Sequence, residues 1–316
     1  MRIVAGDIGG TKTLLRCVDE ESVRVEQRFD STSYKTFDAL LTEFFERCEK
    51  PIDAACFAVA GPVLQNKAEV TNLHWAIDAA QLADVFVVRH VSLINDFYAI
   101  ALGVPLLSPA DRLSINEGKR QPREPIAIIG AGTGLGEAAV VWVGDQWHVV
   151  PSEGGHADFA PQDEEQSKLM LWLIERYGHA SWERVCSGMG LVNIFTLLGG
   201  PKESADPARI AELATSGDAV ASKTMAMFVD IYGAEAGNMA LRLLARGGVH
   251  LAGGIAAKNV ELLKGGRFMK AFCRKGRFAD MMREMPVDII TDQKVGLRGA
   301  AEMARRFASF KRPLWD

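Results

Sequence analysis

Two glycine-rich segments have the composition of loops that hold phosphate groups. The first, G-D-I-G-G-T-K, spans residues 6–12, and the second, G-A-G-T-G-L-G, spans residues 130–136. Glycines let the backbone approach a ligand closely and point successive N–H groups at one anion, while Thr11 and Thr133 add hydroxyl donors. Either segment alone is equally consistent with a glycine-rich hairpin turn. Two of them at equivalent points of a repeated pattern favour phosphate binding.

An acid inside the first loop, Asp7, indicates that a divalent cation accompanies the phosphates, since Mg²⁺ takes oxygen ligands and often keeps water between itself and a carboxylate. A third glycine pair, Gly253-Gly254, separates a predicted strand from a predicted helix that begins near Asn259. Such a turn can pack against a purine, and the helix N-terminus favours phosphate, although for this pair taken alone a plain strand-to-helix connection is the favoured interpretation. Neither the dinucleotide fingerprint nor the P-loop pattern is present.

A second group of residues has the chemistry to bind sugar hydroxyls. Asn95-Asp96 follows a predicted strand, at the edge where open α/β sheets place ligands. The amide donates and accepts hydrogen bonds, and the carboxylate accepts them and can take a proton from a hydroxyl. The same pair is also suited to cap a helix beginning at Phe97, and both roles are compatible.

Glu153 and His156 lie in S-E-G-G-H, an acid and an imidazole separated by two glycines. No partner ligands stand at metal-binding spacing from His156, so a hydrogen bond to a hydroxyl is favoured over a metal. Glu183, ahead of the glycine turn 187–190, is a third acid, which the sequence alone places on a helix surface.

Alternating hydrophobic patterns indicate the elements that position these residues. Phe37, Leu40, Leu41 and Phe44 follow the spacing of an amphipathic helix, with Thr36 as its N-cap. Strands are predicted over 2–5, 13–18, 22–29, 54–60 and 85–94, and again over 125–129, 135–143, 146–152, 249–252 and 287–291. Further helices are predicted around 169–177, 218–245 and 297–307. Two copies of one βββαβα plan, joined at 116–124, account for this order.

The composition limits the class of protein. At about 150 residues per domain, 316 residues indicate roughly two domains. With 36 Lys and Arg against 40 Asp and Glu, the net charge of −4 makes nucleic acid an unfavourable partner. No apolar run approaches the roughly 20 residues of a membrane span, and Asp7 interrupts any signal sequence, so we expect a cytoplasmic protein without membrane association. Five cysteines without C-x-x-C spacing argue against disulfides and structural zinc.

Taken in order, the motifs resemble those of the bacterial glucokinase family over essentially the whole chain. They are D-I-G-G-T-K (7–12), A-G-P-V (60–63), N-D-F (95–97), G-A-G-T-G-L-G (130–136), S-E-G-G-H-A-D-F-A-P (152–161), S-G-M-G-L (187–191) and L-A-G-G-I (251–255). The resemblance implies an α/β, two-lobed actin-like ATPase (ribonuclease H-like) fold with a cleft between lobes. We expect a smaller lobe at 1–108, onto which the C-terminal helix 296–316 packs, and a larger lobe at 109–295. Residues 157–185 contain no cysteine, which disfavours the related branch that carries a zinc site.

The resemblance also implies a role for each motif residue. Asp96 would be the catalytic base, and D-glucose would be bound by Asn95, Asp96, Glu153, His156 and Glu183. ATP would be bound by Gly6, Asp7, Ile8, Gly9, Gly10, Thr11, Lys12, Gly132, Thr133, Gly134, Gly253 and Gly254. Asp7 would hold Mg²⁺, through water. The family suggests a homodimer.

These features predict transfer of the γ-phosphoryl group of ATP to the 6-hydroxyl of D-glucose. One alternative is a kinase of mannose, fructose or an N-acetyl hexosamine, which would differ around the 2-position of the sugar. The other is a non-catalytic sugar sensor, which predicts degraded phosphate loops and a DNA-binding extension, whereas here both loops are intact and the first strand starts at Arg2. A structural role would leave the loops and the acids unexplained.

Overall fold

The chain divides into two compact units. The computed structural model describes residues 1–20, 22–70 and 72–309. Unit 1 comprises Met1–Leu107 and Asp292–Asp316, and unit 2 comprises Ser108–Thr291. The lobe boundaries expected from the sequence, 1–108 and 109–295, lie within a few residues of these. The part of the expected helix 296–316 that follows Ser309 lies outside the described residues.

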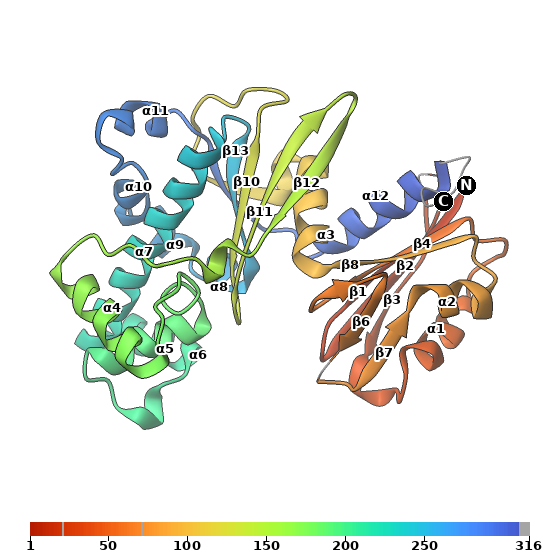
Figure 1. Cartoon of the computed structure of the whole chain (residues 1–316), viewed down its shortest axis with the longest axis horizontal. Helices are drawn as coiled ribbons and strands as arrows, with labels where there is room; N and C mark the ends of the chain where they lie inside the picture. The colour runs from red at the N-terminus through yellow and green to blue at the C-terminus, as the bar shows by residue number, and fades with distance from the viewer. Residues whose placement is uncertain (21, 71, 310–316) are drawn as a thin grey trace. The chain divides into compact units, whose positions relative to one another are not determined.

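Unit 1 is built on a five-stranded sheet of order β3-β2-β1-β4-β8 (Figure 1). Its strands are β1 (Arg2–Ile8), β2 (Lys12–Asp19), β3 (Ser22–Asp30), β4 (Ala54–Val59) and β8 (His90–Asn95), and its helices are α1 (Phe37–Phe45), α2 (Ala79–Phe86), α3 (Asp96–Gly103) and α12 (Val295–Ser309). β1, β4 and β8 run parallel. Every residue of β4 is buried, as expected for a parallel strand covered on both faces. The carboxyl ends of these three strands therefore meet at one edge of the sheet.

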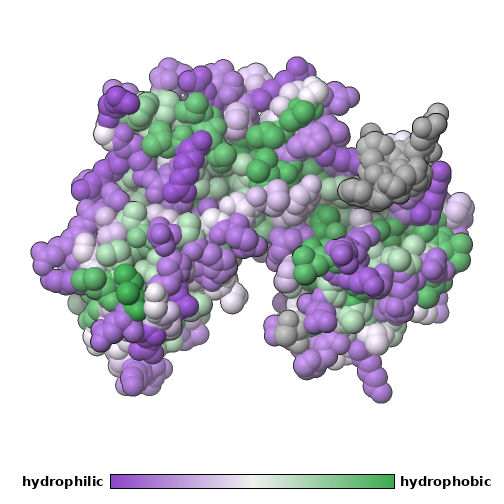
Figure 2. Space-filling model, viewed as in Figure 1, coloured by the Kyte–Doolittle hydropathy of each residue, from purple (hydrophilic) through white to green (hydrophobic). Residues whose placement is uncertain are grey.

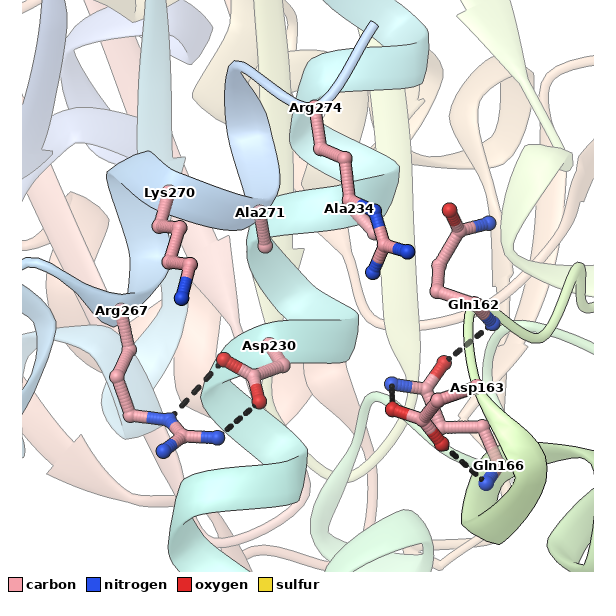
Figure 3. Close-up of a pocket in the computed structure, with 9 residues that line it drawn as sticks. All are labelled: Gln162, Asp163, Gln166, Asp230, Ala234, Arg267, Lys270, Ala271 and Arg274. Atoms are coloured by element: carbon pink, nitrogen blue, oxygen red, sulfur yellow. Dashed lines mark hydrogen bonds and ion pairs between the residues drawn. The ribbon is translucent and has the colours of Figure 1, made fainter.

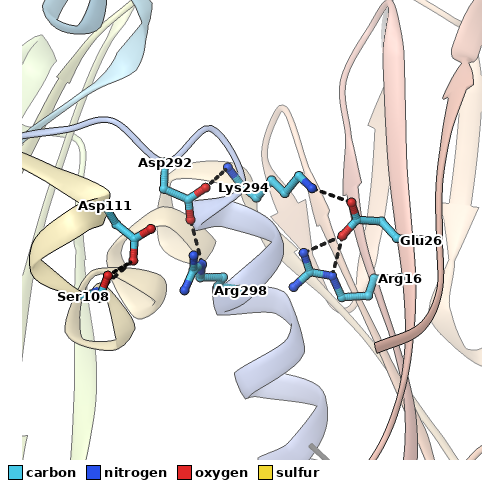
Figure 4. Close-up of polar contacts among 7 residues, drawn as sticks. All are labelled: Arg16, Glu26, Ser108, Asp111, Asp292, Lys294 and Arg298. Atoms are coloured by element: carbon cyan, nitrogen blue, oxygen red, sulfur yellow. Dashed lines mark hydrogen bonds and ion pairs between the residues drawn. The ribbon is translucent and has the colours of Figure 1, made fainter. Parts of the chain in front are cut away.

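Helix α12 joins unit 1 although it follows unit 2 in the sequence. It packs on β1, β4 and α3 through small residues. A Cβ atom on Gly299 would overlap the carbonyl oxygen of Ala99, so the two helices approach as closely as their backbones allow. Just before the helix, the Lys294 ammonium lies 2.5 Å from the Glu26 carboxylate on β3, which also accepts a hydrogen bond from Arg16 (Figure 4).

Unit 2 is built on a six-stranded sheet of order β12-β11-β10-β13-β14-β9. Its strands are β9 (Arg112–Asn116), β10 (Ile126–Ala131), β11 (Leu135–Val143), β12 (Gln146–Ser152), β13 (Gly248–Ala252) and β14 (Val287–Ile290). Its helices are α4 (Glu164–Tyr177), α5 (Gly188–Leu197), α6 (Pro207–Thr215), α7 (Ala219–Leu243), α8 (Gly253–Lys258), α9 (Val260–Lys264), α10 (Arg267–Phe272) and α11 (Ala279–Arg283). β10, β13 and β14 run parallel, and β11 and β12 are antiparallel neighbours.

The duplicated plan is confirmed, because β3-β2-β1-β4-β8 and β12-β11-β10-β13-β14 repeat the same strand order and directions. Two expectations are wrong in detail. The strand expected over 85–94 begins only at His90, because Val85 and Phe86 end α2. The segment expected to be a plain crossover follows an edge strand, β9, and a separate three-stranded sheet of β5 (Val63–Leu64), β6 (Lys67–Val70) and β7 (Trp75–Asp78) was not expected.

Hydrophilic side chains cover most of the visible face of each unit, with hydrophobic ones scattered among them (Figure 2). No helix among the described residues has both the length and the hydrophobicity needed to cross a bilayer. The five cysteines are free, and four of them are buried among apolar side chains.

Candidate active site

Two acidic side chains lie at the carboxyl edge of the unit 1 sheet, on either side of the end of β4. Asp7 lies near the end of β1, and Asp96 begins α3 directly after β8. Burial, followed by the charge of Asp96, raises the pKa of Asp7 to about 6. Burial also raises the pKa of Asp96. Because burial disfavours the ionised form of both carboxylates and the charge of Asp96 disfavours that of Asp7 further, a cation or a proton is favourable at this edge of the sheet.

Asn95 fixes the position of Asp96. The Asn95 Oδ1 atom accepts hydrogen bonds from the N–H groups of Phe97 and Tyr98, at 2.9 and 3.1 Å, so the expected helix cap is present. Its Nδ2 atom donates to the carbonyl oxygen of Gly61 at 3.1 Å, which ties the cap to the A-G-P-V motif. Both ends of this amide therefore have protein partners, and the Asp96 carboxylate is held at the first turn of α3.

The first glycine loop is a hairpin turn between β1 and β2. Gly6 and Ile8 are buried within β1, and a Cβ atom on Gly6 would lie 2.6 Å from the Phe57 ring. Gly6 is thus required for packing, whatever it does toward a ligand. In the turn itself, the Gly9 N–H donates to the carbonyl oxygen of Lys12 at 3.0 Å. Gly10, Thr11 and Lys12 complete this turn at the surface.

The second loop and the third glycine pair lie side by side in unit 2. Gly132–Gly134 connects β10 to β11, with the Gly132 N–H donating to the carbonyl oxygen of Gly134 at 2.9 Å and with Thr133 exposed. Gly253 and Gly254 follow β13, which pairs with β10. Gly253 has φ +85° and faces the Ala131 carbonyl oxygen, so a side chain there would be strained. This arrangement brings two predicted nucleotide segments to neighbouring strand ends.

Three of the predicted sugar-binding residues come together in unit 2. Glu153 follows β12, and Gly154–His156 forms a single 3₁₀ turn. The Glu183 N–H donates to the Gly155 carbonyl oxygen at 2.7 Å. His156 Nδ1 lies 3.9 Å from Glu183 Oε1, and His156 Nε2 lies 3.9 Å from Glu153 Oε2. A group of two acids and one imidazole, of which Glu153 and His156 are largely exposed, can donate to and accept from several hydroxyls at once.

The expectation that Glu183 lies on a helix surface is wrong. It lies in a turn segment between α4 and α5, and its side chain is only 21% exposed. Its Oε2 atom accepts a hydrogen bond from the Leu135 N–H at 3.0 Å. Because Leu135 directly follows Gly134, this carboxylate joins the predicted sugar-binding residues to the predicted phosphate loop.

Comparison with known proteins identifies the family. The glucokinase family model matches residues 4–307. The chain belongs to the glucokinase family. A glucokinase of Nostoc sp. is 40% identical to it, over 96% of this chain and 99% of the relative. Among solved structures, a glucokinase from an Antarctic psychrotroph superposes with a TM-score of 0.88 at 29% identity, covering 96% of this chain and 99% of that one.

Family membership makes the chain a glucokinase with the α/β fold of actin-like, ATP-dependent sugar kinases. A ROK hexokinase from Thermus thermophilus shares this fold, with a TM-score of 0.70 and 20% identity over 97% of this chain. The resemblance inferred from the motifs is therefore confirmed. Within the part of the chain that the structure describes, no group of three or more His, Cys, Asp or Glu residues is arranged to hold a metal ion.

One buried acid close to these motifs was not expected from the sequence. Glu137, on β11, is only 4% exposed, and a Cβ atom on Gly154 would overlap its Oε2 atom. The sequence does show an acid within the otherwise apolar strand L-G-E-A-A-V-V-W-V. Whether that acid is buried depends on residues far along the chain, which the local sequence does not reveal. In this glucokinase, Glu137 lies directly beneath the turn that carries His156.

A cavity of about 190 Å³ in unit 2 lies apart from the motif residues. It opens between the start of α4, the middle of α7 and α10 (Figure 3). Asp230 pairs with Arg267 on one side, and Asp163 caps α4 on the other by accepting from the Gln166 N–H. The two acids that line the cavity, Asp163 and Asp230, are thus already bound to other groups of the protein.

Proposed function

We propose that the chain transfers the γ-phosphoryl group of Mg·ATP to the 6-hydroxyl of D-glucose, with Asp96 as the catalytic base. The observation that carries this assignment is that Asp96 and Asp7 lie at the same edge of one sheet, where the charge of Asp96 acts on Asp7. One acid follows the predicted sugar-binding strand, and the other lies in the predicted phosphate loop, two strands away in the same sheet. A base and a phosphate site at one sheet edge are what transfer to a bound hydroxyl requires.

The environment of Asp96 supports its role. A free aspartate, with a pKa near 3.9, is a weak base at neutral pH. Burial raises the pKa of Asp96, which makes its carboxylate a stronger acceptor for the proton of the 6-hydroxyl. In a loose phosphoryl-transfer transition state the hydroxyl gains little bonding to phosphorus, so we expect Asp96 to orient the hydroxyl first and to take its proton late.

The residues that we assign to sugar binding are Asn95, Asp96, Glu153, His156 and Glu183. The contacts among the unit 2 residues support this assignment, because they hold acceptors and donors within a few ångströms of one another before any ligand is present. Buried polar groups left unpaired by a deoxy analogue would discriminate strongly against it.

The glycine-rich segments at 6–12, 132–134 and 253–254 would hold the nucleotide. The chemistry at Asp7 fits Mg²⁺, because a carboxylate whose pKa is raised by burial and by the charge of Asp96 gains from a hard cation, and Asp7 itself lies in the loop. Bound Mg²⁺ neutralises charge on the phosphates. Asp7 would hold it through water, and the nearby turn would orient the phosphates. We also propose a homodimer, which sedimentation analysis tests, and a cytoplasmic location.

An ADP-release assay over a panel of sugars tests the proposal. With ATP and Mg²⁺, we expect D-glucose to give the highest kcat/KM among glucose, mannose, fructose, N-acetylglucosamine and 2-deoxyglucose. Mass spectrometry or NMR of the product should place the phosphate on the 6-oxygen. Omission of Mg²⁺ should abolish turnover. Higher kcat/KM for another hexose would assign the chain to that sugar instead.

A further inference from the structure

Glu137 is a buried acid that none of the predicted sugar or nucleotide contacts uses. It is the third residue of β11, and it pairs in register with Ser152, the last residue of β12. Its Oε1 atom has no hydrogen-bond partner within the described ranges. Its Oε2 atom lies so close to Gly154 that a Cβ atom there would overlap it. The carboxyl group therefore lies against the backbone of the turn that positions Glu153 and His156.

A second acid, Glu235 on α7, also faces this place. Glu235 is completely buried, but both of its oxygens are satisfied: Arg242 donates to Oε1 at 3.0 Å and Asn238 donates to Oε2 at 2.7 Å. Lys275 lies behind them, donating to Asn238 Oδ1 at 2.7 Å. The Arg242 guanidinium and the Lys275 ammonium are thus bound to Glu235 and to its partner Asn238. Glu137 has no cation in contact with it among the described residues, so a charge there would be poorly compensated.

Of the two acids Glu137 and Glu235, it is therefore Glu137 that carries a proton. Burial, followed by the negative charge of Glu235, raises its pKa to about 8, and the charge of Arg242 opposes this only in part. The remaining titratable neighbour is the thiol of Cys186, whose pKa is raised well above its usual value by burial and by the same two acids. At neutral pH the thiol and Glu137 are both uncharged, and Glu235 and Arg242 form the ion pair.

We propose that Glu137 is a positioning residue, whose neutral carboxyl group supports the sugar-binding turn at Gly154 from beneath. The inference rests on the proposed assignment of Glu153 and His156 to the glucose site. Loss of the proton would leave an unpaired carboxylate against the Gly154 backbone and beside Glu235. The turn would have to move or the carboxylate would have to gain water, and either change displaces the groups that bind glucose.

The expected consequence is weaker glucose binding at alkaline pH, caused by a residue that does not contact glucose. Above the pKa of Glu137, the dissociation constant should rise by up to about tenfold per pH unit, because binding must then include uptake of one proton. The maximal rate at saturating glucose should change much less than KM.

The test is the pH dependence of glucose affinity, measured by calorimetry from pH 7 to 9.5. The wild type, Glu137→Gln and an exposed control on α4, Glu175→Gln, are compared. Glutamine has the same shape and no proton to lose. We expect Glu137→Gln to bind glucose within about threefold of the wild type at pH 7 and to lose the alkaline rise, while the control keeps it. A rise that persists in Glu137→Gln, as titration of Lys275 would cause, overturns the proposal, as does a flat wild-type profile.

A second variant keeps the test decisive if Glu137→Gln does not fold. Glu235→Gln removes the charge that raises the pKa of Glu137, so the alkaline rise should begin at lower pH; an unchanged onset contradicts the mechanism. His156→Ala separates this inference from the site assignment. If His156→Ala binds glucose normally at pH 7, the assignment of the sugar site is wrong. If it binds weakly but Glu137→Gln behaves like the wild type, only the role of Glu137 is wrong.

Discussion

Replacement of Glu183 should impair both the predicted sugar-binding residues and the predicted phosphate loop of unit 2, because its carboxylate contacts both. Its Oε2 atom accepts from the Leu135 N–H at 3.0 Å, and its Oε1 atom lies 3.9 Å from His156 Nδ1. Leu135 is 7% exposed, so its N–H group would find little water if the acceptor were removed. Leaving a buried donor unsatisfied costs about 1–3 kcal/mol. Glu183→Ala should lose this amount, divided between folding stability and ligand binding.

Two substitutions separate the contributions. Glu183→Gln retains an amide oxygen for the Leu135 N–H and removes only the charge facing His156. We therefore expect Glu183→Gln to unfold within roughly 2 °C of the wild type and to bind glucose about 5- to 100-fold more weakly, since a charge-assisted hydrogen bond to the sugar is lost. Glu183→Ala should show the same loss for glucose, a melting temperature lower by roughly 2–10 °C, and a higher KM for ATP as the phosphate loop loosens.

The assays are differential scanning fluorimetry without ligand and steady-state kinetics with each substrate varied. Glu175→Ala on the exposed face of α4 is the matched control, and it should behave like the wild type in both. The reasoning fails if Glu183→Ala melts at the wild-type temperature with unchanged KM for both substrates. It fails in part, at the link to the phosphate loop, if only the KM for glucose changes.

Three other substitutions test the remaining parts of the fold and the site. Asp96→Asn should lower kcat by at least about 100-fold while the glucose dissociation constant changes only a few-fold, as expected when a base is lost and the hydrogen-bonding shape is kept. Gly299→Ala should lower the free energy of unfolding by about 1–3 kcal/mol in urea titrations, because its Cβ atom would overlap the Ala99 carbonyl oxygen. Burial and the charge of Arg120 lower the pKa of His250 to about 3, so the unfolded chain binds one proton more below pH 6.5 and stability should fall with acidity from there, by about 1.4 kcal/mol per pH unit. His250→Gln should flatten this slope between pH 6 and 4, and an unchanged slope would assign the acid sensitivity to other groups.

Local sequence signals predicted most of the elements that carry the site. The glycine turns between β-branched runs indicated the hairpins β1-β2 and β10-β11, and the capping residue Thr36 gave the start of α1. The hydrophobic stripe of the long helix predicted around 218–245 gave α7. Alternating and continuous apolar runs gave the parallel strands. What local signals missed were the short edge elements: β5, β6, β7 and β9 are two to five residues long and partly polar, so their hydrophobic pattern is too brief to stand out.

The site residues also differ in whether the local sequence identifies them. The local sequence is enough to identify Asn95 and Asp96, because a polar pair directly after a strand can cap the next helix and lies at the sheet edge where ligands bind. It does not identify Glu183, since what fixes its carboxylate is the N–H group of Leu135, 48 residues earlier in the chain. Glu137 is also not identified by its local sequence, because its pKa depends on the charge of Glu235, which lies on a helix far along the chain. Long-range hydrogen bonds and burial of this kind leave no periodic trace in a single sequence.

The glycines of unit 2 show why the motifs near the sugar-binding residues depend on one another. A Cβ atom on Gly134 would overlap the Glu183 carboxylate, one on Gly154 would overlap Glu137, and one on Gly155 would overlap the Leu135 carbonyl oxygen. These glycines are therefore required by neighbouring side chains and backbone, whether or not they also approach phosphate. Because the start of β11 and the turn at 153–156 are packed together at Gly154 and Gly155, and Gly134 packs against Glu183, a shift in one of these segments displaces the others. Changes in the phosphate loop should then alter glucose affinity as well as ATP affinity, and the two KM values of Gly134→Ala should rise together.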